Sequence, residues 1–275
     1  MRTVLNTREK QKASLEVLNF LHSFSKEKGL IYYLAYGTLI GAVRHHGFIP
    51  WDDDVDVFIP RPDYEKLLKI FHDPSGNFKL CTCFNDPTYV LPYAKIQNMK
   101  TNRILPDGTI LDEGIGIDLF PLDGISGDIC EAEQLFRKEN EKFRHIVQRY
   151  DRLRYTQAKD PVSFLKSIVG KTYYKTGYLK RIGQQNSKNP FLSDYNNCSR
   201  VVPAIGVHSG AFRIFEKEWF EPIEMEFEGF ELTGPKGYDE ILKMIYGDYM
   251  IVPPEEDRTS THQEEYTWRQ ATADI

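Results

Sequence analysis

Four aspartates stand within five residues at the entrance to an apolar strand, and this cluster restricts the fold more than any other feature. The run reads WDDDVDVFI over residues 51–59. Like charges packed against a buried strand are unfavourable unless a cation neutralises them. Alternation along a strand places Asp54 and Asp56 on one face, about 7 Å apart. Two carboxylates at that spacing can share one or two hard cations, and Mg²⁺ held by such a pair and by substrate phosphates is the usual arrangement.

Two other interpretations of the acidic run are weaker. The run matches the first acidic positions of an EF-hand calcium loop, but Val57 stands where that loop needs glycine. Asp63 stands where the loop needs a bidentate glutamate, beyond two prolines. A solvated acidic turn is the ordinary interpretation of an isolated Asp run. Trp51 on one side and the apolar strand on the other disfavour it here.

Residues before and after the acidic run extend the pattern. Gly37-Thr38 follows a short apolar run and opens a short helix, where small residues let backbone N–H groups approach a phosphate. Asp118 lies inside a later apolar run, and a buried Asp without a partner is costly, so a shared metal site explains it. The order of glycine and hydroxyl residue, helical spacer, Asp-x-Asp pair and third carboxylate resembles the polymerase-beta-type nucleotidyltransferase pattern.

Hydrophobic periodicity predicts the class of fold. Strands come first, then helices, then strands again, which indicates an α+β protein. We expect a nucleotidyltransferase-like mixed-sheet core with flanking helices and a helical insertion. The expected parts are a catalytic core over 1–127, a helical region over 128–200, and C-terminal strands and a helix over 201–275. The predicted helices are 7–28 with an Asn6/Glu9 capping box and a Gly29 end, 38–44, 62–71, 128–155, 161–182 and 238–246. The predicted strands are 31–35, 55–59, 78–84 paired with 89–99, 115–122, 201–206, 212–215 and 223–232. Residues 186–197 are expected to form a loop, and the tail, 253–275, is polar and broken by prolines.

Composition and targeting signals exclude several classes of protein. The net charge of −5 argues against a protein that grips nucleic-acid backbone. The N-terminus has no apolar core of a signal peptide, and no window approaches 18 uncharged apolar residues. We therefore expect a cytoplasmic protein without a transmembrane segment, able to contact the inner membrane face. Cys81 and Cys83 are interpreted as reduced core cysteines on one strand face. A zinc site would need two more ligands and stays open.

A longer stretch carries a closer resemblance. YGTLIGAVRHHGFIPWDDDVDVFIPRPDY, residues 36–64, resembles the signature of the LicD family, whose relatives include fukutin and fukutin-related protein. PYAKIQNMKTNR, residues 92–103, ahead of GIDLFPLDG, and YDEILKMIYGDYMIVPPEEDR, residues 238–258, are similar to LicD segments too. Together they span nearly the whole chain in the expected order, while the helical middle carries no recognised motif.

This resemblance implies a Mg²⁺-dependent phosphotransferase. Its donor would be CDP-choline, and phosphocholine would pass to a sugar hydroxyl of a cell-surface glycan precursor of teichoic-acid or lipopolysaccharide type, releasing CMP. Carried over to this chain, Asp54 and Asp56 match the metal-binding pair. Asp118 matches the third carboxylate, either a metal ligand or the base for the acceptor proton. One or two Mg²⁺ ions are expected, with Mn²⁺ as a substitute.

The resemblance also implies how the phosphates would be held. Gly37 and Thr38 match the nucleotide-phosphate turn. Arg44 and Lys95 are the nearest candidates for added positive charge, and the alternative for Arg44 is a surface ion pair with an aspartate. His45 and His46 point in different directions, which makes them poor joint ligands.

The choline headgroup adds a requirement, because a quaternary ammonium has no hydrogen-bond donor and is held by aromatic faces and carboxylates. Core packing is the ordinary role of each ring. The candidates are Trp51, Tyr93, Tyr155, Tyr173, Tyr174 and Trp219.

Three alternatives stay open at this stage. A nucleotidyltransferase of the same fold would release pyrophosphate from a nucleoside triphosphate. A related transferase would use CDP-ethanolamine or CDP-ribitol. A non-catalytic choline-binding module is disfavoured because the chain has no aromatic repeat. The acceptor is expected to be a glycan, lipid-linked at the inner membrane face, and no nucleic-acid partner is expected.

Overall fold

The computed structural model describes residues 3–86, 89, 91–155, 161–162, 165, 168–169, 190–203, 213–258 and 264–269. The chain forms two units. The first comprises residues 1–80, 95–119 and 219–275, and the second comprises 81–94 and 120–218. Helices combine with a curled mixed sheet, which confirms the expected α+β class. The expected three-part division of the chain stays a prediction.

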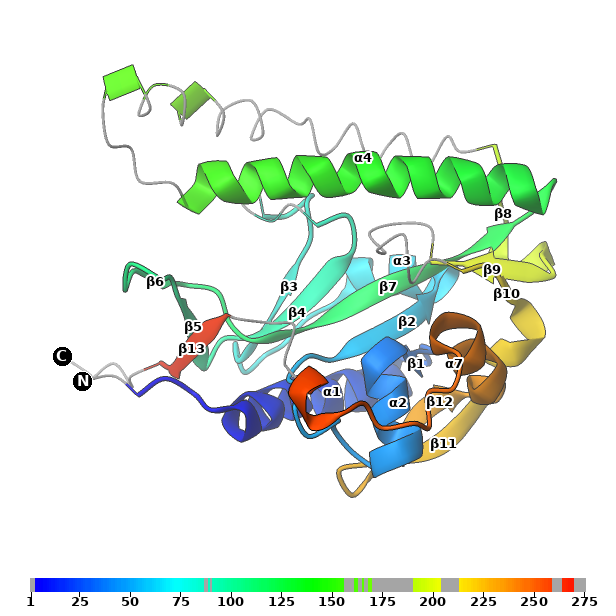
Figure 1. The fold of residues 1–275 in the computed structure, drawn as a ribbon, viewed down its shortest axis with the longest axis horizontal. Helices are drawn as coiled ribbons and strands as arrows, with labels where there is room; N and C mark the ends of the chain where they lie inside the picture. Colours follow the sequence, from blue (N-terminus) through cyan, green and yellow to red (C-terminus); the bar gives the residue numbers. More distant parts are fainter. Residues whose placement is uncertain are drawn as a thin grey trace. The chain divides into compact units, whose positions relative to one another are not determined.

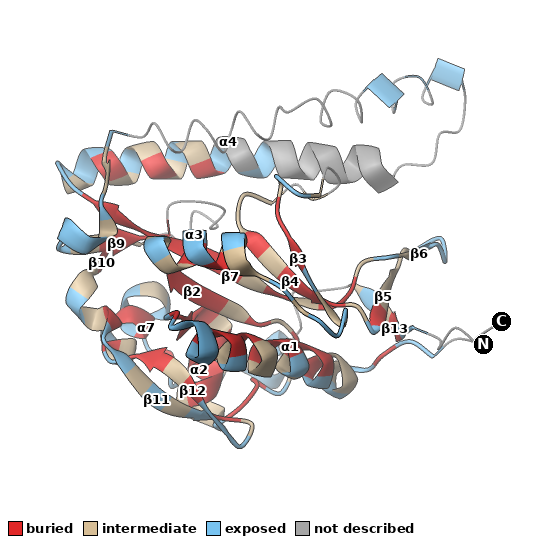
Figure 2. Cartoon of the chain, turned by 180° about the vertical axis from the view of Figure 1, so that it is seen from behind, coloured by how far each residue is buried: buried red, intermediate tan, exposed pale blue. Residues whose placement is uncertain are grey.

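Helix α1 (Thr7–Lys28) opens the first unit with both of its predicted ends. The Asn6 side chain accepts from the Glu9 N–H at 3.0 Å, and the Glu9 carboxylate accepts from the Asn6 N–H at 2.8 Å. Gly29, with φ of 61°, ends the helix in the left-handed conformation that glycine adopts at little cost. Figures 1 and 2 both place α1 with α2 and α7 on the same side of strand β2.

The strands of the main sheet follow the order β1-β2-β7-β4-β3. Their bounds are Tyr33–Leu34 (β1), Asp56–Pro60 (β2), Gly116–Ile125 (β7), Ala94–Asn98 (β4) and Phe78–Cys81 (β3). The predicted pairing of the two central runs is confirmed, because β3 and β4 are neighbours. Strand β3 ends at Cys81, so Cys83 does not share its strand face as predicted. A turn in which the Thr82 N–H donates to the Asn85 side chain at 2.7 Å takes the place of the longer strand.

Other elements of the first unit surround β1 and β2. They are α2 (Tyr36–His45), α3 (Arg61–Ile70), the hairpin β11 (Pro222–Phe227) and β12 (Phe230–Pro235), α7 (Tyr238–Tyr246) and the short 3-10 helix Glu255–Asp257. Helix α7 has the bounds that its periodicity predicted. The interior is apolar and aromatic, with Tyr33, Leu34, Phe58 and Leu39 fully buried.

The polar tail contains a strand that the sequence did not predict. Strand β13 (Glu265–Trp268) pairs antiparallel with β5 (Thr101–Ile104), which also pairs with β6 (Ile110–Leu111). The N–H of Leu5 donates to the carbonyl of Tyr266 at 2.8 Å. The Tyr266 ring packs on the buried cluster Leu5, Ala13 and Ile115.

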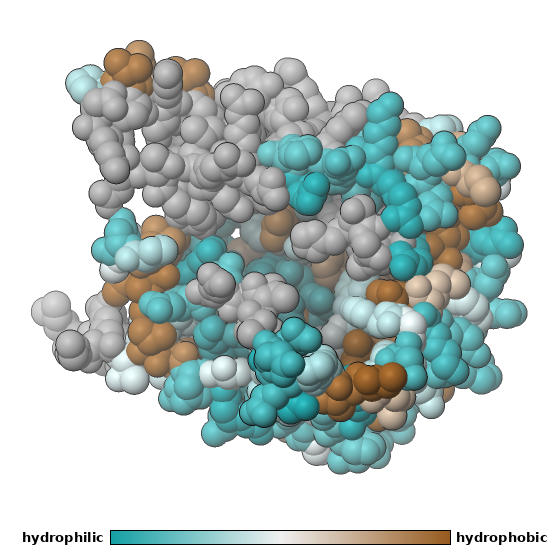
Figure 3. Space-filling model, viewed as in Figure 1, coloured by the Kyte–Doolittle hydropathy of each residue, from teal (hydrophilic) through white to brown (hydrophobic). Residues whose placement is uncertain are grey.

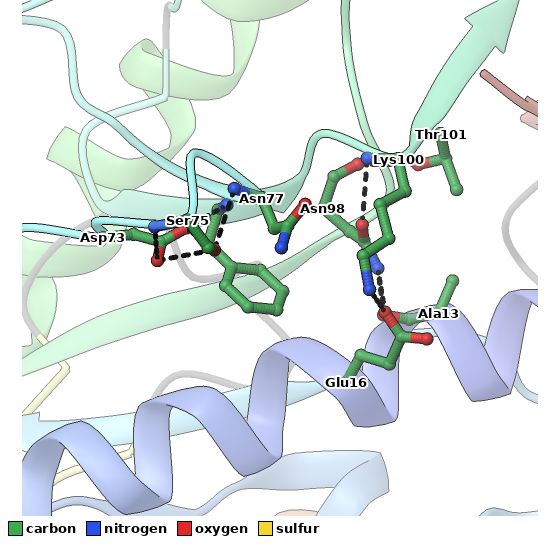
Figure 4. A network of polar contacts seen from close by, with 9 residues as sticks. Ala13, Glu16, Asp73, Ser75, Asn77, Asn98, Lys100 and Thr101 are labelled. Atoms are coloured by element: carbon green, nitrogen blue, oxygen red, sulfur yellow. Dashed lines mark hydrogen bonds and ion pairs between the residues drawn. The ribbon is translucent and has the colours of Figure 1, made fainter. Parts of the chain in front are cut away.

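A polar network fixes the turn after β4 against α1 (Figure 4). The Asn98 amide donates to the carbonyl of Ala13 at 3.1 Å, and its side-chain oxygen accepts from the Lys100 N–H at 3.0 Å. Lys100 also pairs with Glu16 at 2.9 Å. The strand that carries Lys95 is therefore anchored at its far end to the first helix.

The second unit contains the long helix α4 (Ile129–Tyr155), which confirms the predicted helix, and the strands β8 (Leu192–Ser193), β9 (Arg200–Val202) and β10 (Phe215–Glu216). β8 and β9 pair with the end of β7. Ile125, Ala132, Phe136 and Val202 form its buried apolar cluster. The strand β8 and the 3-10 helix Tyr195–Asn197 replace part of the expected loop. Most of the predicted helix 161–182 and parts of the strands 201–206 and 212–215 lie outside the described residues.

None of the helices in the described part of the chain has both the length and the apolar character that a membrane crossing requires.

Candidate active site

The acidic run, residues 52–56, divides its carboxylates between two faces. Asp53 is buried and its carboxylate pairs with Lys10 of α1 at 2.8 Å. Asp52, Asp54 and Asp56 are half-buried and alternate with buried neighbours. The alternation predicted for Asp54 and Asp56 is therefore visible in the burial pattern. Asp53 serves as an anchor, and the other three carboxylates form what we call the acidic face.

The first turn of α2 holds the backbone of Asp56 at two points. The Asp56 N–H donates to Thr38 Oγ1 at 2.9 Å, and its carbonyl accepts from the Ala35 N–H at 3.0 Å. Between them, Tyr36 has φ of 45°, a strained conformation for an aromatic residue. Its ring packs edge-on against Phe58 at 4.8 Å. Thr38, predicted as a phosphate residue, thus positions Asp56 directly.

Gly37 lies against the carboxylate of Asp52. A Cβ atom at Gly37 would stand 2.9 Å from Asp52 Oδ2, so a side chain there would have to displace the carboxylate. Ala35 provides no side-chain cap to α2, and the partial positive charge of a helix N-terminus favours an anion. The small residue predicted for a close approach to phosphate here lies in close approach to Asp52.

Asp118 is brought to the acidic face by strand pairing. Its N–H donates to the carbonyl of Val55 at 2.9 Å. Its carboxylate pairs with Lys95 of β4 at 2.9 Å, and the two side chains are 21% and 24% exposed. The Lys95 chain crosses Gly116, where a Cβ atom would stand 2.8 Å from Lys95 Cγ. The structure therefore brings Asp54, Asp56, Asp118 and Lys95 close together, and their roles stay predictions.

Electrostatics single out Asp56 within this site. Burial raises the pKa of the Asp56 carboxyl well above its usual value, and the carboxylates of Asp54 and Asp118 raise it further. Burial, the largest single influence, lowers the pKa of Lys95. The charge of Asp118 and its hydrogen bond, together with the charges of Tyr266 and Asp56, outweigh burial and raise that pKa. The ammonium of Lys95 is therefore a positive charge built into the site, and it only partly offsets the repulsion between Asp56 and the neighbouring carboxylates.

The chemistry of the donor set fits a hard divalent cation, although the carboxylates are not arranged around one. Within the described residues, no three His, Cys, Asp or Glu side chains are grouped closely enough to hold a metal ion. Lys95 engages one oxygen of Asp118, and Asp52 is turned toward Gly37. Asp54 and Asp56 are the pair best placed to receive a metal. Asp118 could join them by exchanging Lys95 for the ion.

Arg44 does not point to the acidic face. Its Nη1 donates to the carbonyls of Tyr249 at 2.6 Å and Ile251 at 3.3 Å, and its Nε donates to His45 at 3.0 Å. With the residues that the structure describes, Arg44 forms no ion pair with an aspartate, and its phosphate contact stays a prediction. Arg44 instead fixes the segment that follows α7. The His45 ring lies edge-on to Trp51 at 6.3 Å between ring centroids, whereas His46 Nδ1 lies 3.8 Å from Glu226, so the two histidines point in different directions.

Two tyrosines near the site were missed from the sequence. Burial, followed by the carboxylates of Asp56 and Asp54, raises the pKa of Tyr246, so its phenol lies in the field of the acidic face. Burial raises the pKa of Tyr266 in the tail strand, and Lys95 opposes that shift. Both positions depend on long-range packing. Asp52 could have been found, because it continues the two-residue alternation of Asp54 and Asp56.

The candidate headgroup aromatics are dispersed. Trp51 adjoins the acidic run, with the Arg258 guanidinium 5.3 Å from its ring centroid. Trp219 packs against Gly237 in the hairpin region. In the second unit, Tyr93 packs against Phe120 at 4.4 Å. Tyr173, Tyr174 and the side chain of Tyr155 lie outside what the structure describes.

Comparison with known proteins gives these residues a context. The family profile described as "LicD/FKTN/FKRP, nucleotidyltransferase domain" matches residues 29–147. The chain is 30% identical over 269 residues to the lipopolysaccharide cholinephosphotransferase LicD of Haemophilus influenzae, covering 95% of this chain and 97% of that protein. An uncharacterized protein of Rickettsia typhi is 41% identical over 64% of this chain and 43% of its own length. Mannosyltransferase regulator 4 of Saccharomyces cerevisiae is 25% identical over 52% of this chain and 13% of its own length.

Proposed function

The chain belongs to the LicD family, and from that premise we propose that it transfers phosphocholine from CDP-choline to a sugar hydroxyl of a cell-surface glycan precursor. The relative that matches nearly its whole length is named a lipopolysaccharide cholinephosphotransferase. A glycan of lipopolysaccharide or teichoic-acid type is therefore the acceptor class that we propose. We place the reaction in the cytoplasm, at the inner membrane face where a lipid-linked acceptor would be presented.

The observation that carries this proposal is the convergence of Asp54 and Asp118 on Asp56, because these two carboxylates raise the pKa of Asp56 even though Lys95 lowers it. Phosphoryl transfer depends on positioning and on neutralising the charge of the phosphates, more than on covalent chemistry by the protein. We propose Mg²⁺, in one or two ions and replaceable by Mn²⁺, at Asp54 and Asp56. When bound, the metal would neutralise the diphosphate and the departing CMP.

The protein residues would act on the acceptor and on the geometry. The acceptor oxygen forms a bond to the phosphorus that carries choline, and the bond from that phosphorus to the bridging oxygen breaks, so CMP leaves. Asp118 either takes the acceptor proton or joins the metal ligands, and Lys95 orients its carboxylate at 2.9 Å. The first turn of α2 keeps Asp56 in place through Thr38 and Ala35.

Release of CMP tests the proposal. Purified protein, CDP-choline, Mg²⁺ and a glycan acceptor should yield CMP and a phosphocholine-bearing glycan. Asp54→Asn and Asp56→Asn should stop the reaction, while Glu228→Gln, which changes a carboxylate away from the site, should not. An absence of CMP release with lipopolysaccharide and teichoic-acid precursors alike would overturn it.

A nucleotidyltransferase is the second candidate, because the matching family profile is described as a nucleotidyltransferase domain. Such an enzyme would release pyrophosphate from a nucleoside triphosphate and leave the nucleotide on the acceptor. Product analysis separates the two reactions. A thermal-shift series with CDP-choline, CDP-ethanolamine, CDP-ribitol and nucleoside triphosphates would identify the donor, because a ligand that binds the folded state raises the melting temperature.

A further inference from the structure

The segment that follows α7, residues 246–258, is here called the strap, and it borders the acidic run at both ends. At its start, the phenol of Tyr246 lies in the field of Asp56 and Asp54. At its end, the Arg258 guanidinium lies 5.3 Å from the ring centroid of Trp51, the residue that precedes the acidic run. The middle of the strap is exposed and apolar at Met250, Ile251 and Val252, seen as a hydrophobic patch in Figure 3.

The strap has a fixed course. Arg44 Nη1 binds the carbonyls of Tyr249 and Ile251, and the Tyr249 hydroxyl donates to Asp239 at 2.9 Å. The Arg258 Nε donates to the carbonyl of Pro253 at 2.9 Å, which closes the last turn of the strap on itself. These bonds hold the guanidinium of Arg258 at Trp51.

The cations around the acidic face differ in what they bind. Lys95 is paired with Asp118, Lys10 with Asp53, and Arg44 with strap carbonyls. The two terminal amino groups of Arg258 make no hydrogen bond or ion pair with any residue that the structure describes. Arg258 is therefore a positive charge held at the acidic run by an aromatic face and one backbone bond.

We propose that Arg258 binds the phosphate groups of the donor and that Trp51 holds its guanidinium in position. The inference rests on the proposed function, because it assigns the substrate of the same site. A planar guanidinium forms paired hydrogen bonds with phosphate oxygens, and stacking on a ring leaves its edge open for them. Arg258 takes the role that the sequence had suggested for Arg44, whose Nη1 the strap itself occupies.

A competing use of the Trp51 ring would give a different result in the binding experiment described below. The Trp51 face could instead bind the quaternary ammonium of choline, with Arg258 as an occupant that choline displaces. In that case, removing Arg258 would increase the affinity for CDP-choline and leave the affinity for CDP-ethanolamine unchanged. Under our proposal, removing Arg258 lowers the affinity for both donors equally.

The experiment measures binding of CDP-choline, CDP-ethanolamine and inorganic pyrophosphate with Mg²⁺ by calorimetry, together with kcat and KM for CMP release. Loss of a charge-assisted bond should weaken both donors and pyrophosphate by about tenfold or more in Arg258→Ala. Arg258→Lys should recover part of the affinity, because the charge returns without the planar fork. Trp51→Leu should weaken all three ligands less than Arg258→Ala does.

Arg61→Ala is the matched control. Arg61 also stacks at 5.3 Å, over Tyr64, but it has Glu65 as an ion-pair partner at 3.6 Å. Its variant should keep all affinities within about twofold. Circular dichroism and melting temperature would show that each variant is folded.

Three results would overturn the inference: unchanged affinities in folded Arg258→Ala, selective tightening of CDP-choline, or an equal loss in Arg61→Ala. Pyrophosphate binding separates this inference from the proposed function. The parent protein could release no CMP and still bind pyrophosphate with an affinity that Arg258→Ala lowers. The proposed function would then be wrong, but the assignment of Arg258 to a phosphate site would hold.

Discussion

Glu228 at the hairpin turn and Asp56 in the acidic run are both carboxylates with little solvent access, and they have opposite surroundings. The Glu228 side chain is 17% exposed and accepts from Arg8 at 2.6 Å and from the Phe48 N–H at 3.2 Å. The hydrogen bond with Arg8 lowers the pKa of Glu228. Burial raises the pKa of Asp56, and Asp54 raises it further. A carboxylate that has its cation anchors the fold, whereas one placed among other carboxylates favours the binding of a cation from outside.

The largest test of this contrast is Asp56→Asn. The amide removes the carboxylate that we propose as a metal ligand, so CMP release should fall by about a thousandfold. The same change relieves like-charge repulsion, so the melting temperature of the metal-free protein should rise. Steady-state kinetics and calorimetric melts check the two effects. A variant that lost both activity and stability would show that Asp56 is a structural residue like Glu228.

Gly116→Ala tests whether the pairing of the Lys95 ammonium with Asp118 contributes to catalysis. Its Cβ atom would stand 2.8 Å from Lys95 Cγ and 2.5 Å from the carbonyl of Ile96. Displacing Lys95 from Asp118 should lower kcat by about ten- to a hundredfold. Lys95→Met should reproduce the loss, and the double variant should be no worse than either single variant. Additive losses would mean that Gly116 acts independently of Lys95.

Glu228→Gln should have the opposite effects to Asp56→Asn: a loss of stability without a loss of activity. Losing a charged partner of Arg8 and weakening the bond to the Phe48 N–H should lower the free energy of unfolding by about 1–2 kcal/mol. The kcat for CMP release should stay at the parent value. Denaturant unfolding and steady-state kinetics check this pair of results. A loss of kcat without a loss of stability would assign Glu228 to the site.

The pH dependence of stability gives the smallest and most diagnostic effect. The folded-state pKa of Asp56 is raised, so the unfolding free energy should fall as pH rises above about 4, until the pH passes that raised value. The folded-state pKa of Glu228 is lowered, so its stabilisation is present above about 4 and is lost as pH falls through that lowered value.

Melting curves from acid to neutral pH without divalent ions measure both slopes. Asp56→Asn should flatten the decline toward neutral pH, and Glu228→Gln should flatten the acid-side loss. Added Mg²⁺ should reduce the Asp56 slope only. If the pH dependence of the melting temperature were unchanged in Asp56→Asn, the claim that Asp56 and Glu228 have opposite electrostatic surroundings would be wrong.

Local signals predicted the elements that local chemistry determines. Helix α1 begins at the Asn6/Glu9 capping box and ends at Gly29, because both devices act within a few residues. Helix α7 has the bounds that its apolar periodicity indicated. Strand β2 and the alternation of the acidic run were also readable, because one buried face alternates with one open face.

Long-range pairing decides the features that the sequence concealed. Strand β13 lies in a polar tail and forms only because β5, more than 150 positions earlier, offers an edge to it. The partner of Arg44 is a backbone carbonyl of the strap, which no side-chain pattern encodes. The pairing of Lys95 with Asp118 depends on the neighbouring positions of β4 and β7, so the sequence indicated both residues but not their bond.

The ten residues of α2 connect the two ends of the site, and this constrains how the chain can vary in length. The first turn positions Asp56, and Arg44 near the last residue fixes the strap. One inserted residue would rotate these two functions by about 100° relative to each other, and a whole inserted turn would separate them by about 5.4 Å. Insertions and deletions within residues 36–45 should therefore not be tolerated, and a library of single-residue insertions along α2 would test this.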